Sequence, residues 1–264
     1  MSAASTPPPD QNPASPRMGW REAWAVYISP PAWRMFFLGF AAGLPLLLVL
    51  GTLSFRLREA GVDRTTIGFL SWVGLAYAFK WAWAPLVDRL PLPLLHRWLG
   101  RRRSWLLLAQ CAIVIGLIGM GRVDPQADLS ALVGWALLVA FGSATQDIAL
   151  DAYRIESASA RHQAALAATY QTGYRLAMIW AGAGALWLAA SAQTQAGYQH
   201  QAWHWAYLAM AASMGVGLLT VLLSPEPVAV PRPAARDLGT WLRQALVEPF
   251  AQFITTHRWN AVLI

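Results

Sequence analysis

The feature that most constrains this chain is a set of six long stretches, each with at most one charged residue. They occupy residues 33–55, 67–85, 105–121, 129–150, 164–190 and 203–223. A helix needs about 20 apolar residues to cross a bilayer, and backbone inside a bilayer must satisfy its own hydrogen bonds. These stretches are too uniformly apolar for β-barrel strands, which alternate over about 10 residues. The sequence therefore predicts an all-α, polytopic membrane protein with a six-transmembrane-helix bundle over residues 33–223.

Composition and charge support the same class of protein. Only 12% of the 264 residues are charged, against about 25% in soluble domains, which excludes an ordinary soluble enzyme. Of the 20 Lys and Arg residues, 14 lie in the amino-terminal segment and the even-numbered loops, and only four lie in the odd-numbered loops. This asymmetry predicts a membrane protein with its amino terminus and even loops in the cytoplasm. Topology thus explains the net charge of +7, so we expect the lipid bilayer, and no nucleic acid, as a partner.

The two ends of the chain differ from the spans in composition. Residues 1–32 are rich in Pro, Ser and Ala, which predicts a disordered cytoplasmic tail without a removable signal peptide. Residues 224–258 form a cytoplasmic linker, whose apolar residues from Leu238 to Leu246 follow the spacing of an amphipathic helix on the inner membrane surface. Residues 259–264 begin a seventh helix that is cut short. We therefore expect this chain to be one half of a larger protein.

Three charged residues lie well inside the predicted spans, Lys80, Asp147 and Arg175, whereas Arg34 stands at the mouth of the first span. Such residues are costly in hydrocarbon and indicate function by default. We therefore expect the second, fourth and fifth spans to face a protein interior or a wet cavity, and the third and sixth to face lipid. Lys80 and Asp147 both lie ~11 Å inside the inner boundary, and Arg175 lies ~16 Å deep, at 1.5 Å per residue.

Depth alone allows a Lys80–Asp147 ion pair. With Arg175 near mid-bilayer, Asp147 would be shared between two cations, and an anionic substrate group could balance the charge left over. Two structural alternatives remain open: Lys80 extends its ammonium to the interface, and Asp147 is a static counter-ion instead of a protonatable coupling site.

Polar residues near this charge network are further candidates. Tyr170, Gln171, Tyr174 and Gln146 could offer hydrogen bonds to a sugar or peptide, or could equally pack helices together. Asp151 lies at i+4 from Asp147, and Arg154 follows Asp151 at i+3, spacings that allow side chains to meet on one helix face. We expect the Asp151–Arg154 pair to act as a cytoplasmic gate or latch.

An intramembrane protease was considered and excluded. Ser143 and His204 lie on predicted helices, but Phe141 stands where a G-x-S motif needs glycine. Ser143 lies ~21 Å below the end of its helix at which His204 begins the sixth span, whereas a base and nucleophile need contact at about 3 Å. The single cysteine, Cys111, excludes an internal disulfide or a Cys-based zinc site. We predict no catalytic residues, no metal site and no cofactor.

The loop after the second span, WAPLVDRL…LGRRRSWLL, resembles the inter-helix signature of the major facilitator superfamily, with extra residues between Arg89 and Gly100. The resemblance narrows to AmpG-type muropeptide permeases through longer motifs. These are LGFAAGLPLLLVLGTL (38–53), TIGFLSWVGLAYAFKWAWAPLVDR (66–89), GRRRSWLL (100–107), GSATQDIALDAYRIE (142–156) and TGYRLAMIWAGAGALWLA (172–189).

This resemblance implies the amino-terminal half of a transporter that imports anhydro-muropeptides from periplasm to cytoplasm in cell-wall recycling, driven by protons. It implies that Lys80, Asp147 and Arg175 match the family's intramembrane charges. It also assigns the inner gate to five residues of the signature loop: Asp88, Arg89, Arg101, Arg102 and Arg103. Because the family has at least twelve helices, the carboxy-terminal helical half is an expected partner. The alternatives are a permease for another bulky anion, such as acetyl-CoA, and a non-transporting membrane scaffold fragment.

Overall fold

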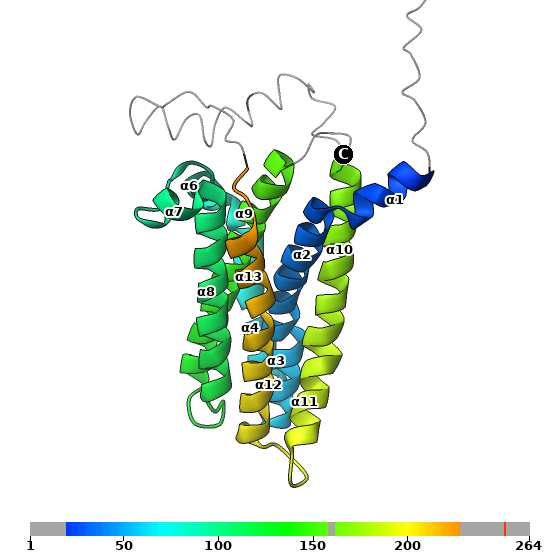
Figure 1. Cartoon of the computed structure of the whole chain (residues 1–264). Helices are drawn as coiled ribbons and strands as arrows, with labels where there is room; N and C mark the ends of the chain where they lie inside the picture. Colours follow the sequence, from blue (N-terminus) through cyan, green and yellow to red (C-terminus); the bar gives the residue numbers. More distant parts are fainter. Residues whose placement is uncertain (1–19, 158–161, 228–250, 252–264) are drawn as a thin grey trace, which may run out of the picture.

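A computed structural model describes residues 20–157, 162–227 and 251, and in this part of the chain it contains helices and no strands (Figure 1). The longer elements are α1 (Trp20–Ile28), α2 (Pro30–Val49), α3 (Gly51–Glu59), α8 (Arg101–Arg122), α9 (Leu129–Ser157), α10 (Gln163–Ile179), α11 (Ala185–Ala192), α12 (His200–Ser213) and α13 (Gly215–Leu223). We call the end of the bundle where α2, α8 and α10 begin the upper end, as drawn in Figure 1, and the other the lower end.

Five helical stretches among the described residues are long and apolar enough to cross a membrane. They are Pro30–Glu59, Arg101–Arg122, Leu129–Ser157, Gln163–Ala192 and His200–Leu223. Each corresponds to one of the predicted spans. The helical, multi-pass architecture expected from the sequence is thus confirmed, with five of its spans as long helices.

The second predicted span, 67–85, is helical but interrupted. It consists of α4 (Arg64–Leu70), a 3₁₀ turn (Ser71–Gly74), α5 (Leu75–Ala78), a second 3₁₀ turn (Lys80–Ala82) and α6 (Ala84–Arg89). Pro85 lies in the first turn of α6 and has no backbone N–H to donate to the preceding turn, so the helix cannot continue unbroken through it. The prediction of one uninterrupted helix is wrong here. The segment packs chiefly on α9.

The predicted tail is also shorter than expected. Within residues 1–32, the structure forms α1 from Trp20 and begins α2 at Pro30, where proline is favourable because its N–H would be unpaired in the first turn anyway. Disorder up to residue 32 is therefore wrong for the last part of this segment. Residues 1–19, most of the linker 224–258 and the start of the seventh helix at 259–264 lie outside the described residues.

Helices α2 and α10 approach each other closely because glycines face the contact. A Cβ at Gly39 would lie 2.2 Å from the carbonyl oxygen of Tyr170, and one at Gly43 would lie 2.3 Å from that of Tyr174. From the other side, a Cβ at Gly173 would lie 2.0 Å from the carbonyl oxygen of Phe36. Small residues at such contacts let membrane helices pack backbone to backbone. The G-x-x-x-G step of the first span therefore serves close packing.

The third span is more enclosed than predicted. Of an 18-residue apolar stretch of α8, 61% is buried inside the bundle, whereas only 28% of the corresponding stretch of α10 and α11 is buried. Gly116 and Gly142 explain this burial, because the first packs against Val139 of α9 and the second against Ile113 of α8. The expectation that the third span faces lipid is thus wrong for most of its surface. A lack of charge does not determine which helix the bundle encloses.

Arg56, expected in the first odd-numbered loop, is instead fully buried in α3 near the lower end. Its Nη1 donates to the carbonyl oxygen of Met120 at 2.6 Å, and its Nη2 donates to that of Val123 at 2.7 Å. These carbonyls belong to the last turn of α8 and its C-cap, where the helix dipole favours a cation. The charge of Arg56 is therefore used to fix the lower end of α8.

We predict that Gly173→Ala destabilises the bundle, because the added methyl group overlaps the backbone of α2. Overpacking of this kind costs about 1–3 kcal/mol of the free energy of unfolding. Thermal or denaturant unfolding of the purified chain in detergent measures it. Gly134→Ala is the matched control, since a Cβ there meets nothing within 4 Å. Equal stability of the two variants would contradict the close-packing account.

Candidate functional site: two clusters of charge

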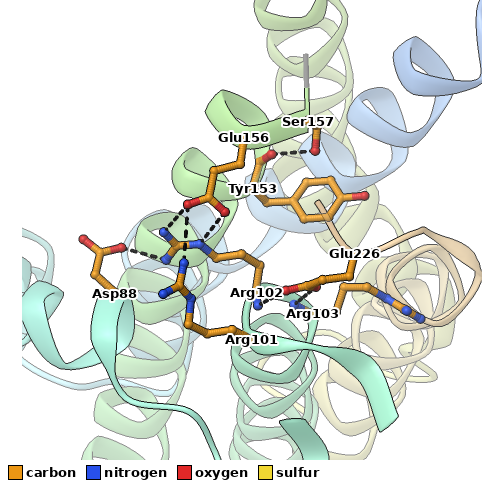
Figure 2. Close-up of polar contacts among 8 residues, drawn as sticks. All are labelled: Asp88, Arg101, Arg102, Arg103, Tyr153, Glu156, Ser157 and Glu226. Carbon is orange, nitrogen blue, oxygen red and sulfur yellow. Dashed lines mark hydrogen bonds and ion pairs between the residues drawn. The ribbon is translucent and has the colours of Figure 1, made fainter. Parts of the chain in front are cut away.

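The first cluster lies at the upper end and centres on Arg102, whose side chain is 1% exposed (Figure 2). Its Nη1 donates to Asp88 Oδ1 at 2.7 Å. On its other side, Nε and Nη2 donate to the two carboxylate oxygens of Glu156 at 3.0 and 2.6 Å. Arg101 adds a longer contact, 3.6 Å from its Nη2 to Glu156 Oε1. Because a guanidinium fork matches a carboxylate in geometry, the Arg102–Glu156 contact is strong and directional.

A third carboxylate completes the first cluster. Glu226 lies just beyond α13 and accepts the backbone N–H groups of Arg102 and Arg103 at 2.8 and 3.1 Å. These are unpaired donors of the first turn of α8, where a negative charge is stabilising. The Arg103 side chain also binds the end of α13, because it donates to the carbonyl oxygens of Val221 and Leu222 at 2.8 and 2.6 Å.

The cluster therefore ties four parts of the chain together at the upper end: α6 through Asp88, α8 through Arg102, α9 through Glu156 and the segment after α13 through Glu226. Gly100 makes room for this arrangement. It has φ of 81°, a conformation that glycine adopts readily, and a Cβ there would lie 2.4 Å from the side chain of Glu226. Such an arrangement can hold the upper ends of the helices in one fixed position.

The cluster contains four of the five residues predicted for the gate loop, together with two residues that were not predicted. The structure brings together Asp88, Arg101, Arg102 and Arg103, and places Arg89 at the last residue of α6. Glu156 and Glu226 were missed. Both acids stand near the ends of apolar spans, and the excess of basic residues on the same side was the available signal that they have partners.

The Asp151–Arg154 pair forms as expected, although it is separate from the Arg102 cluster. Arg154 Nη2 lies 3.3 Å from Asp151 Oδ1 on one face of α9. The Asp151 side chain is 56% exposed, so this pair contributes little stability by itself. The guanidinium of Arg154 also lies 6.0 Å from the ring centroid of Tyr170, which connects α9 with α10.

The second cluster lies deeper and contains the predicted intramembrane charges. Lys80 Nζ lies 3.7 Å from Asp147 Oδ2, and the two side chains are 39% and 23% exposed. The interrupted segment 64–89 positions Lys80 against α9, helped by Trp83, whose indole N–H donates to Thr145 Oγ1 at 3.1 Å. The ion pair that depth allowed is therefore present, and it remains accessible from outside the chain.

Helix α10 borders this pair. Its Tyr170 and Tyr174 have ring centroids 6.0 Å apart, and α10 contacts α9, which carries Asp147. Gln171 and Arg175 on the same helix are exposed. Within the described residues Arg175 makes no ion pair, so the expectation that Asp147 is shared between Lys80 and Arg175 is wrong in this conformation.

Two other sequence-based candidates are placed differently. Gln146 is fully buried, so the structure contradicts its prediction as a residue lining a cavity. It precedes Asp147 by one position in a helix, and neighbouring side chains point about 100° apart, so the two cannot share a face. Ser143 is buried in α9, while His204 at the lower end contacts the carbonyl oxygen of Gly121 at 3.1 Å. No contact joins Ser143 and His204 in the described part of the chain.

Comparison with known proteins points to one family. A family model described as "Acetyl-coenzyme A transporter 1" matches residues 33–192. The anhydromuropeptide permease of Escherichia coli (strain K12) is 38% identical over 240 residues, which is 90% of this chain and 45% of the relative. A putative transporter AmpG 4 of Rickettsia felis is 41% identical over 155 residues, 59% of this chain and 37% of the relative. The chain thus spans less than half the length of these curated relatives.

We predict that Arg102→Gln lowers the free energy of unfolding by roughly 3–5 kcal/mol, the cost of removing one partner of a buried ion pair. Glu156→Gln is expected to cost a similar amount. The double variant should cost clearly less than the sum, because the two residues contact each other. Unfolding in detergent is the measurement.

Arg97→Gln is the matched control for this cycle, since Arg97 is exposed at the same end of the molecule. Surface substitutions of this kind change stability by about 0.5 kcal/mol or less. Strict additivity of Arg102→Gln and Glu156→Gln would show that the cluster does not act as one unit.

Proposed function

Because this chain belongs to the AmpG-type permease family of the major facilitator superfamily, we propose that it is the amino-terminal half of a proton-coupled transporter. The proposed cargo is anhydro-muropeptide, imported from periplasm to cytoplasm for cell-wall recycling. The observation that carries this proposal is the accessible Lys80–Asp147 ion pair in a membrane-spanning bundle, with a further exposed cation, Arg175, on α10. Facilitator-type transport rocks two helical halves around a midplane site, so the second half is a required partner.

The proposed orientation places the upper end in the cytoplasm, in an inner membrane. The density of arginines there supports this, since cytoplasmic loops carry the excess of Lys and Arg. The Arg102 cluster then lies at the cytoplasmic end and acts as the inner gate. Its contacts hold α6, α8, α9 and the segment after α13 in one arrangement, so the cluster would fix this half as a rigid body while the two halves move.

In the proposed mechanism, Asp147 carries the proton. In the unprotonated state its carboxylate neutralises Lys80 at 3.7 Å. When a proton from the periplasmic side binds the carboxylate, Asp147 becomes neutral and the Lys80 ammonium loses its partner. A carboxylate of the muropeptide takes that place, and Arg175 binds a second anionic group. Release of proton and substrate to the cytoplasm restores the pair. The Lys80 charge is thus balanced both before and after the substrate binds.

A second candidate substrate is another bulky anion, such as acetyl-CoA. The specific observation in its favour is a match to a family model over residues 33–192. That model is described as "Acetyl-coenzyme A transporter 1". The Lys80 and Arg175 cations suit either anion. The peptide and sugar of a muropeptide offer more neutral hydrogen-bonding groups, which Gln171, Tyr170 and Tyr174 can meet. The relatives are named permeases and transporters, which favours transport over both catalysis and a scaffold role.

We predict that Asp147→Asn abolishes uptake driven by a proton gradient in a transporter that completes this chain to the length of its relatives. Asparagine keeps the shape of the side chain but carries neither the proton nor the charge. Proteoliposomes with an imposed pH gradient and labelled anhydro-muropeptide provide the assay. Asp63→Asn is the control and should retain gradient-driven uptake, because Asp63 is an exposed N-cap of α4 and asparagine caps a helix equally well. Intact uptake in the Asp147→Asn variant would remove the proton-carrier role.

We predict that Arg175→Ala weakens substrate binding, because it removes the exposed cation of α10. The loss of one charge-assisted contact corresponds to roughly 1.5–3 kcal/mol, or about 10–100-fold in affinity. Competition between labelled anhydro-muropeptide and unlabelled acetyl-CoA measures affinity and ranks the two substrates. Arg175→Lys is the control and should restore part of the binding. Unchanged affinity in Arg175→Ala would rule out the anion contact, and stronger competition by acetyl-CoA would favour the second substrate.

A further inference from the structure

Helix α1 carries a stripe of large apolar side chains that no described part of the chain covers. Trp20, Trp24, Tyr27 and Ile28 are 82, 60, 44 and 66% exposed. Their spacing of i, i+4, i+7 and i+8 places them on one side of the helix. We call these four residues the α1 stripe. Three aromatic residues within nine is a high density for an exposed surface helix, so the stripe is expected to have a partner.

The other side of α1 faces the bundle. Val26 and Ser29 line a hollow at the upper end together with Leu166 of α10, and the Ser29 hydroxyl donates to the carbonyl oxygen of Val26 at 2.6 Å. Helix α1 contacts α2 and α10. It is therefore positioned by the bundle through one side only, and the α1 stripe points away from these contacts.

The direction of α1 is equally informative. Figure 1 shows that it leaves the upper end of α2 and runs across the direction of the long helices, outward from the bundle. Trp33 and Phe37, in the first two turns of α2, are 50 and 37% exposed and stack with ring centroids 5.8 Å apart. These two residues lie where a membrane-spanning helix enters the bilayer, next along the chain to the stripe. Aromatic side chains prefer this interfacial level.

We propose that α1 is an interfacial helix that lies in the plane of the membrane, with the α1 stripe inserted among the headgroups of the leaflet at the upper end. The occupant of the stripe is lipid. Helices of this kind bury their apolar side about 5–10 Å into the boundary between headgroups and acyl chains. Through Ser29 and Pro30, α1 leads directly into α2, the helix that packs along α10, and so anchors that helix pair to the membrane surface. This proposal rests on membrane insertion and is independent of the substrate.

The test uses spin labels on single cysteines, because Cys111 is the sole cysteine and is replaced by serine as background. Trp24→Cys and Tyr27→Cys report on the stripe. Ala25→Cys is the matched control, as Ala25 is exposed on the same helix but lies outside the stripe. The full chain is reconstituted in vesicles of neutral and anionic phospholipid. Collisions of each label with oxygen, which concentrates in lipid, and with a water-soluble nickel chelate give the depth.

The proposal predicts high oxygen and low chelate accessibility at positions 24 and 27, corresponding to about 5–10 Å below the phosphates, and the reverse at position 25. High chelate accessibility at positions 24 and 27 would place the stripe in water and overturn the proposal. Low accessibility to both reagents would show that protein covers it, which also overturns it. Agreement of two separate stripe positions guards against a variant that misfolds, since unfolding would expose all three labels to the chelate.

Discussion

An ionic group is costly in hydrocarbon, and the arrangement of the charged residues in this structure follows from that cost. Several charges at the ends of the described helices are satisfied by the chain itself, either by an opposite charge or by a helix end. Arg102 lies between the carboxylates of Asp88 and Glu156. Glu226 caps the start of α8, and Arg56 caps its end. Because α8 is held at both ends in this way, it gives the bundle a fixed frame on which the other helices pack.

The deeper charges follow a different rule. Lys80 and Asp147 pair at a distance of 3.7 Å while remaining partly exposed, and Arg175 is exposed without an ion pair in the described part of the chain. The stretch of α10 and α11 that includes Arg175 is only 28% buried. Charges of this kind are tolerated where they border water or another protein surface. The charges at the ends of α8 have fixed partners, whereas the Lys80–Asp147 ion pair remains accessible. This difference is the physical basis of the proposed transport mechanism.

The sequence predicted the spans well, because a run of about 20 apolar residues has few alternatives to a membrane helix. Depth along the helices also allowed the Lys80–Asp147 pair, which the structure contains. Interruption of the second span at Pro85 and burial of Gln146 were not predicted, since apolar runs specify neither local breaks nor rotation about the helix axis. Glu156 and Glu226 were missed because an acid near a helix end resembles a solvated charge until its partner is known. The roles of the predicted site residues remain predictions.

The central claim is that Lys80, Asp147 and Arg175 border a watery passage between two helical halves. Cysteine accessibility in the completed transporter tests it most directly, with Cys111 replaced by serine. Arg175→Cys is compared with Leu219→Cys on α13, where the native side chain is 61% exposed on an apolar surface. The account predicts that a membrane-impermeant thiol reagent modifies position 175, that substrate protects it, and that position 219 stays unmodified. Equal lack of reaction at both positions would contradict the account, because Arg175 would then face lipid.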